Sequence, residues 1–102
     1  MNFTRICEAL RKCPVTRGRR SLIFEPSHAY NWVWMDDEYL IRACDQGEGE
    51  DVMIAAWIKY LRDRGHGPMI MKDRIQIIDA GDIHDIMGDD LLEVLAEAVV
   101  QT

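Results

Sequence analysis

The sequence SLIFEPSHAYNWVWM, residues 21–35, predicts the centre of the fold. A short apolar run at residues 21–25 is followed by a turn signal at Pro26 and Ser27, and large apolar side chains alternate over residues 30–35. This pattern predicts two antiparallel strands joined as a hairpin. Trp32 and Trp34 fall on one face of the second strand, and we expect helices to pack against that face.

A first helix is predicted before this hairpin. Apolar residues recur there at the spacing i, i+3, i+4 and i+7, and Pro14 is expected to end the helix. The residues that define the stripe are Phe3, Ile6, Cys7 and Leu10. Residues 11–20 contain five basic side chains around Pro14 and Gly18, and this composition predicts a basic loop.

Two further helices are expected after the hairpin. The acidic residues 36–38 precede an apolar group at residues 39–44, which predicts a short helix ending near Gly47. Glu50 or Asp51 is expected to begin the strongest helix of the chain. Its apolar arc covers about half the circumference, so we expect it to be the central buried helix, stopped by Gly65.

The last third of the chain predicts β-structure followed by a helix. Residues 69–78 contain two β-rich halves, which indicate a second hairpin or one longer strand. Residues 79–101 show helical periodicity, with apolar side chains on one face and acidic side chains on the other. Gly88 is unfavourable inside a helix, so the alternative is a break there and a helix beginning at Asp89.

Length and composition predict one α+β domain spanning residues 1–102. With 102 residues, 48% of them hydrophobic, the chain supports one core. We expect a small antiparallel sheet of two to four strands packed against three to four helices. No apolar run approaches the length of a membrane span. The odd number of cysteines, without a CxxC pair, favours a reducing cytoplasmic location.

The sequence contains no pattern that predicts catalysis, a cofactor or a metal. Phosphate-binding glycine motifs and calcium-binding loops are absent. His84 lies among aspartates, but we interpret these as a solvated acidic surface and expect no metal site. Cys13 is the best candidate nucleophile, because nearby basic residues favour a lowered thiol pKa, yet no partner base is in view. We therefore expect a protein that is not an enzyme.

The functional prediction is based on the uneven distribution of acidic and basic residues along the chain. The net charge is −6, and residues 76–102 contain seven acidic and no basic side chains. If residues 79–101 form one helix, a row of carboxylates repeats about every helical turn, near 5 to 6 Å, which approximates the phosphate spacing of a nucleic-acid strand. The residues expected to contact a partner are Asp82, Asp85, Asp89, Glu93 and Glu97, with Asp36, Asp37 and Glu38.

We therefore expect a non-catalytic protein-binding module, a small accessory inhibitor or regulator of the phage or mobile-element type. Its acidic face is expected to bind a basic groove on a protein that handles nucleic acid. The alternative is a nucleic-acid-binding module that uses the basic segment, although an acidic chain makes nucleic acid the less favoured partner. The residues of that segment are Arg11, Lys12, Arg17, Arg19 and Arg20. The high content of large apolar side chains also predicts a homodimer, and the alternative is a monomer that buries them all.

Overall fold

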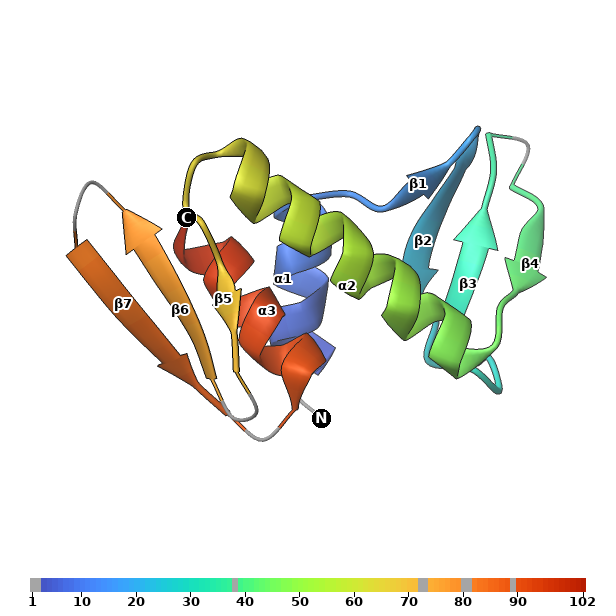
Figure 1. The fold of residues 1–102 in the computed structure, drawn as a ribbon. Helices are drawn as coiled ribbons and strands as arrows, with labels where there is room; N and C mark the ends of the chain where they lie inside the picture. Colours follow the sequence, from blue (N-terminus) through green and yellow to red (C-terminus); the bar gives the residue numbers. More distant parts are fainter. Residues whose placement is uncertain (1–2, 38, 72–73, 80–81, 89) are drawn as a thin grey trace.

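The hairpin predicted over residues 21–35 forms the middle of a four-stranded antiparallel sheet in the computed structural model (Figure 1). The structure describes residues 3–37, 39–71, 74–79, 82–88 and 90–102, without the side chains of residues 78, 79, 82 and 84. The first sheet has the order β1-β2-β3-β4. Its strands are β1 (Thr16–Arg17), β2 (Arg20–Phe24), β3 (Trp32–Met35) and β4 (Ile41–Ala43).

The inner face of this sheet is formed by the predicted tryptophans. Leu22 lies opposite Trp34, and Phe24 lies opposite Trp32, so all four side chains share one face. Helix α1 (Phe3–Lys12) packs on this face, and the Phe3 ring stacks on Phe24 with centroids 4.7 Å apart. The prediction that helices cover the tryptophan face is confirmed.

Helix α2 (Gln46–Asp63) crosses the same face of the sheet, with Met53, Trp57 and Leu61 buried. It begins earlier than predicted, because the Asp45 carboxylate accepts a hydrogen bond from the Gly47 N–H at 2.8 Å and caps the first turn. A Cβ on Gly49 would lie 2.9 Å from the Cβ of Trp32. A glycine here therefore lets the helix approach β3 closely.

The second sheet has three antiparallel strands in the order β5-β6-β7. These are β5 (Met69–Ile70), β6 (Arg74–Asp79) and β7 (Asp82–Met87), and the predicted second hairpin is confirmed by β5 and β6.

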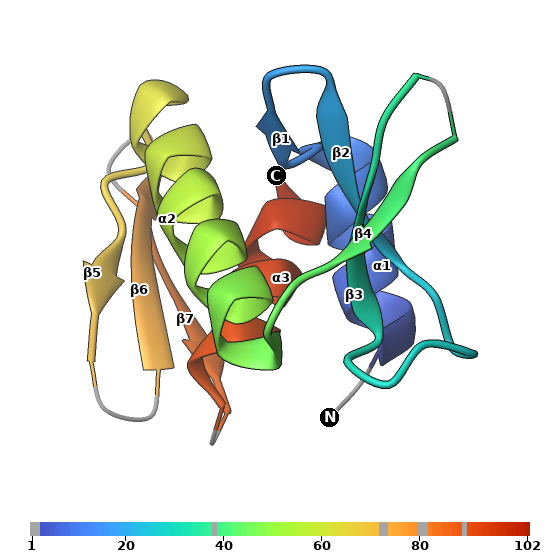
Figure 2. The same cartoon turned by 90° about the vertical axis from the view of Figure 1, so that its right-hand side faces the viewer.

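Helix α3 (Leu91–Gln101) packs against α1, α2, β6 and β7. Figure 2 shows α3 between the other two helices. It buries six of its eleven residues, so α3, rather than α2, is the central helix.

Two predicted helices are wrong. The described residues among 36–44 form no helix, because residues 41–43 pair with β3 as the edge strand β4. Residues 82–87 pair with β6 as β7, so the continuous helix over residues 79–101 does not form. The alternative, a break at Gly88 followed by a separate helix, is confirmed by α3, which begins at Leu91. In both segments a neighbouring strand supplies hydrogen bonds that override the local helical periodicity.

The α+β fold class is confirmed, with two small antiparallel sheets on either side of three helices instead of one sheet. One hydrophobic cluster joins the layers, because it contains Trp32 of the first sheet, Leu95 of α3 and Ile75 of the second sheet. In the described part of the chain, no helix is both long and apolar enough to cross a membrane.

Candidate partner-binding surface

The carboxylates predicted to form one row are divided between two elements. Asp85 is exposed on strand β7, whereas Glu93 and Glu97 lie on helix α3. Asp82 is placed in β7, but its side chain, like the whole of Asp89, lies outside the described residues. Because a strand and a helix replace the predicted continuous helix, the regular spacing of one helical turn between carboxylates is lost.

Glu97 is engaged inside the molecule. Arg5 of α1 donates from Nη2 to Glu97 Oε1 at 2.9 Å, and Gln101 Nε2 donates to the same oxygen at 2.9 Å. These hydrogen bonds lower the pKa of the Glu97 carboxyl, the larger contribution coming from Arg5. Glu97 therefore ties α3 to α1, and a partner would have to compete with Arg5 for it.

The predicted basic loop is instead the end of α1 followed by a two-strand hairpin. Arg11 and Lys12 lie in the last turn of α1, and Lys12 Nζ donates to the Val100 carbonyl oxygen at 3.1 Å. Arg17 pairs with Arg20 across the hairpin, with Gly18 and Arg19 as its turn. Gly18 has φ +62°, and glycine at the first position of a two-residue turn is a known hairpin signal.

Arg17 is held in place by neighbours on other elements. Its guanidinium lies 5.0 Å from the centroid of the Trp34 ring, and Nη1 donates to Glu48 Oε1 of α2 at 2.8 Å. No described carboxylate lies within ion-pair distance of Arg11, Arg19 or Arg20. Within the basic segment, Arg17 and Lys12 are therefore held by other elements, whereas Arg11, Arg19 and Arg20 form no ion pair among the described residues.

Cys13 does not have the environment predicted for a nucleophile. Burial raises the pKa of its thiol, and the nearby Arg64 opposes this rise without reversing it. Its carbonyl oxygen accepts a hydrogen bond from Trp57 Nε1 at 3.2 Å, so the backbone at Cys13 serves to pack α1 against α2. Among the described residues no group of three or more potential metal ligands comes together. The side chain of His84 is outside the described part of the structure.

The connection between β3 and β4 gathers acidic side chains and exposed apolar side chains at one end of the first sheet. We call this surface the acidic–apolar tip and define it by Asp36, Asp37, Tyr39, Leu40 and Ile41. Asp36 closes the connection through its own groups. Its N–H donates to the Leu40 carbonyl oxygen at 3.2 Å, its carbonyl accepts from the Tyr39 N–H at 3.0 Å, and its carboxylate accepts from the Leu40 N–H at 2.9 Å.

The apolar side chains of the tip point away from the core. Tyr39 is 81% exposed, Leu40 49% and Ile41 45%. A run of three exposed apolar residues is disfavoured in a soluble domain unless it serves a function. Ile41 lies opposite Met35, on the face of the sheet that the helices do not cover.

Tyr39 also has an unfavourable backbone conformation. Its φ is +62°, a left-handed value that is uncommon for a bulky side chain and costs about 1–2 kcal/mol. The equivalent position of such a hairpin connection is usually glycine. A strained backbone therefore holds the most exposed aromatic ring of the chain out into solvent.

Sequence reasoning selected part of this tip and missed the rest. Asp36 and Asp37 were predicted as partner-binding residues and are half-buried and exposed, respectively, whereas Glu38 lies outside the described residues. Tyr39 and Leu40 were assigned to the buried face of a helix that does not exist. The available signal was the unbroken Tyr-Leu-Ile sequence after three acids, since consecutive apolar residues do not follow helical spacing.

Searches of protein-family models, curated proteins and solved structures found no match to this chain.

Proposed function

We propose that this chain is a non-catalytic protein-binding module and that the acidic–apolar tip is its main contact surface. The observation that carries the proposal is the 81% exposed Tyr39 ring on a left-handed backbone. Strained, sparsely populated backbone conformations cluster at functional sites. Aromatic side chains supply much of the binding energy in protein interfaces when they enter a pocket of the partner.

The chemistry of the tip defines the partner surface that fits it. Tyr39, Leu40 and Ile41 would fill an apolar depression, and burying apolar area contributes about 25 cal/mol per Å². Asp36 and Asp37 lie at the rim of this apolar group, so the matching depression would have basic residues around it. A basic groove on a protein that handles nucleic acid has this character, and the accessory inhibitor or regulator role rests on this complementarity.

The first measurement determines whether the free chain self-associates through the acidic–apolar tip. Sedimentation at micromolar concentration should give the monomer mass of 11.8 kDa. Full-length wild-type chain is then used to capture and identify a partner, which is purified so that its dissociation constant can be measured. A stable dimer that buries Tyr39 would replace the proposed partner with a second copy.

Variants at two exposed tyrosines make the binding measurement specific. Tyr39→Asn should raise the dissociation constant for the partner at least tenfold, because the substitution removes the aromatic anchor. Tyr30→Asn is the matched control, since Tyr30 is 47% exposed at the opposite end of β3 and should bind as the wild type does. Asp37→Asn should mainly slow association at low salt. A partner that binds the Tyr39 variant as tightly as the wild type removes the tip from the interface.

A nucleic-acid-binding function is the second candidate, supported by the unpaired guanidinium groups of Arg11, Arg19 and Arg20 among the described residues. Lysine and arginine groups of this kind neutralise phosphates in a salt-dependent manner. A gel shift at low salt with single- and double-stranded probes tests it. Retention that is lost when these three arginines become glutamine supports nucleic-acid binding, and an absence of retention rejects it.

A further inference from the structure

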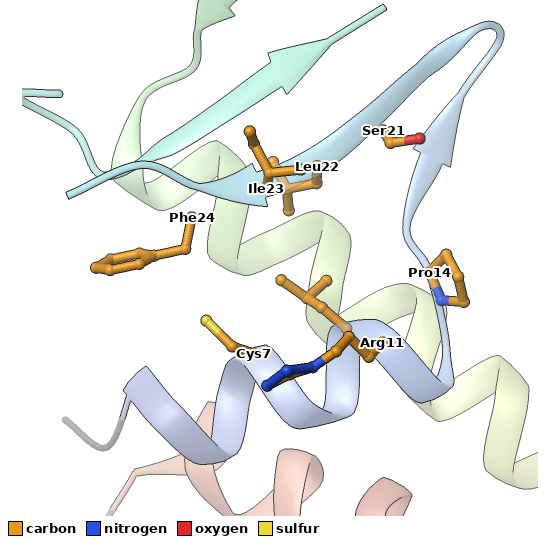
Figure 3. Close-up of a pocket in the computed structure, with 8 residues that line it drawn as sticks. Cys7, Arg11, Pro14, Ser21, Leu22, Ile23 and Phe24 are labelled. Atoms are coloured by element: carbon orange, nitrogen blue, oxygen red, sulfur yellow. The ribbon is translucent and has the colours of Figure 1, made fainter. Parts of the chain in front are cut away.

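A groove runs between helix α1 and strand β2 of the first sheet (Figure 3). Its cavity volume is about 400 Å³, within the range of ligand-binding pockets. We call it the α1–β2 groove. It is lined by Cys7, Leu10 and Arg11 of α1, by Pro14 after the helix, and by residues 21–24 of β2. The α1 residues lie on one helix face, because they are three and four positions apart.

The strand side of the groove is a strand edge rather than a sheet face. Successive side chains of a strand point to opposite faces, so four consecutive residues line one cavity only if the cavity runs along the edge. Strand β1 contains only Thr16 and Arg17, which pair with Ser21 and Arg20. Beyond Leu22, the edge of β2 that faces α1 therefore lacks a partner strand among the described residues.

The hydrogen-bonding direction of β2 can be assigned from two observed bonds. The Leu22 N–H donates toward β1, to the Val15 carbonyl at 2.9 Å, and the Glu25 N–H donates toward the β3 side, to the Asn31 carbonyl at 2.7 Å. Backbone groups alternate along a strand, so Phe24 must point in the same direction as Leu22. The N–H and C=O of Phe24 therefore face the open edge, where the α1–β2 groove lies.

The charge of the groove is positive and comes from one residue. Among the described residues Arg11 is the single charged side chain that lines it, and Figure 3 shows its guanidinium beside the Cys7 thiol, within the groove. The remaining wall is mainly apolar, with Phe24, Leu10, Leu22 and Ile23 as its largest members. An occupant that fits must supply backbone hydrogen bonds, apolar side chains and one carboxylate.

We infer that the α1–β2 groove binds an extended peptide segment of another protein, which adds as a strand to the open edge of β2. Phe24 would exchange main-chain hydrogen bonds with the peptide, alternate peptide side chains would enter the apolar wall, and Arg11 would pair with a peptide carboxylate. Main-chain pairing gives affinity in this mode of recognition, and the side-chain pockets give specificity. The inference is independent of the function proposed for the acidic–apolar tip, because the tip connects β3 to β4 and none of its residues lines the groove.

A pool of synthetic peptides provides the probe. Acetylated six-residue peptides with Val, Ile, Leu, Phe or Thr at each position and a free terminal carboxylate are titrated into the ¹⁵N-labelled full chain. We expect chemical-shift changes centred on the amides of Ile23 and Phe24, and slower solvent exchange of the Phe24 N–H. The same pool with N-methylated backbone amides should cause neither change, because it cannot pair with a strand edge.

Two arginine variants distinguish a specific contact of Arg11 with the peptide from a general effect of positive charge. Arg11→Gln should weaken binding of the peptide pool about tenfold, because a charge-assisted hydrogen bond is lost. Arg19→Gln is the matched control, because Arg19 is exposed in the β1–β2 turn, and it should bind like the wild type. Amidating the peptide terminus should produce the same tenfold loss if the terminal carboxylate is recognised. An amidated pool containing Asp should restore binding if a side-chain carboxylate is recognised.

Three results would overturn the inference. The first is the absence of shifts at Ile23 and Phe24 up to millimolar peptide. The second is equal binding of the normal and N-methylated pools. The third is binding of octanoate as tight as that of the peptides, which would make the groove a site for an apolar carboxylate without strand pairing.

Discussion

Two hairpins of the first sheet contain the same left-handed backbone conformation but place different residues in it. The β1–β2 turn and the β3–β4 connection each place one residue at φ +62°, but the first uses Gly18 and the second uses Tyr39. Glycine adopts this conformation without steric cost, whereas tyrosine does not. In the first hairpin the local sequence agrees with the fold, and in the second it opposes the fold.

The two hairpins also differ in how firmly other elements hold their side chains. Arg17 of the first hairpin is anchored by Glu48 and by the Trp34 ring. Tyr39 of the second hairpin is 81% exposed. Disagreement between local sequence and fold is expected at functional sites, where selection acts on the side chain rather than on stability. This contrast is why the acidic–apolar tip, and not the basic hairpin, is proposed as the main contact surface.

The largest expected effect comes from a residue of the second hairpin that also contacts the first. Trp34 of β3 lies opposite Leu22 of β2 and opposite Arg42 of β4, and it is 4% exposed. Trp34→Ala should lower the free energy of unfolding in urea by about 3–5 kcal/mol, because it leaves a cavity on the inner face. Ile41→Ala, on the outer face of the tip, should cost less than about 1 kcal/mol. Equal losses would mean that the tip is part of the core.

The next effect tests whether the first hairpin needs its glycine. A Cβ added at Gly18 would meet nothing within 4 Å, so a larger residue there tests backbone conformation without a clash. Gly18→Val should lower the free energy of unfolding by about 1 kcal/mol, which combines a left-handed penalty of about 1–2 kcal/mol with a partial gain from a stiffer unfolded chain. An unchanged urea midpoint would remove the proposed contrast between Gly18 and Tyr39.

A smaller effect tests the anchoring of the first hairpin. Glu48→Gln weakens the contact to Arg17, and both side chains are partly exposed, so the global loss should be below about 1 kcal/mol and should shrink at high salt. The local consequence should be clearer. Amide exchange should accelerate in β1 and at the start of β2 while the tip is unaffected. Acceleration at the tip instead would show that the two hairpins are coupled.

The sequence predicted the parts of the fold that local pattern controls. Alternation over residues 30–35 identified β3 and its buried tryptophan face, and the disfavoured position of Gly88 indicated where α3 is separated from the preceding segment. Strands β4 and β7 were missed because their state depends on pairing with the neighbouring strands β3 and β6, and the spacing of apolar residues within each segment does not show this pairing. Ile83 and Met87 have the helical spacing i, i+4, yet both are more than 60% exposed on the outer face of β7, and Ile86 between them is buried.

The candidate site was less predictable than the fold. Asp36 and Asp37 were selected by charge alone, and the α1–β2 groove depends on the short length of β1, which no local pattern revealed. Tyr39 was missed because its apolar character predicts burial, and only the observed backbone angle and exposure show the opposite.

The free energy of unfolding of Tyr39→Asn tests the central claim most directly. Asparagine tolerates the left-handed conformation better than tyrosine, and the exposed ring contributes little packing. Urea unfolding should therefore show a variant as stable as the wild type, or more stable by up to about 1 kcal/mol. A loss of about 1 kcal/mol or more would show that Tyr39 supports the fold itself, and would contradict its assignment as a strained, exposed binding residue.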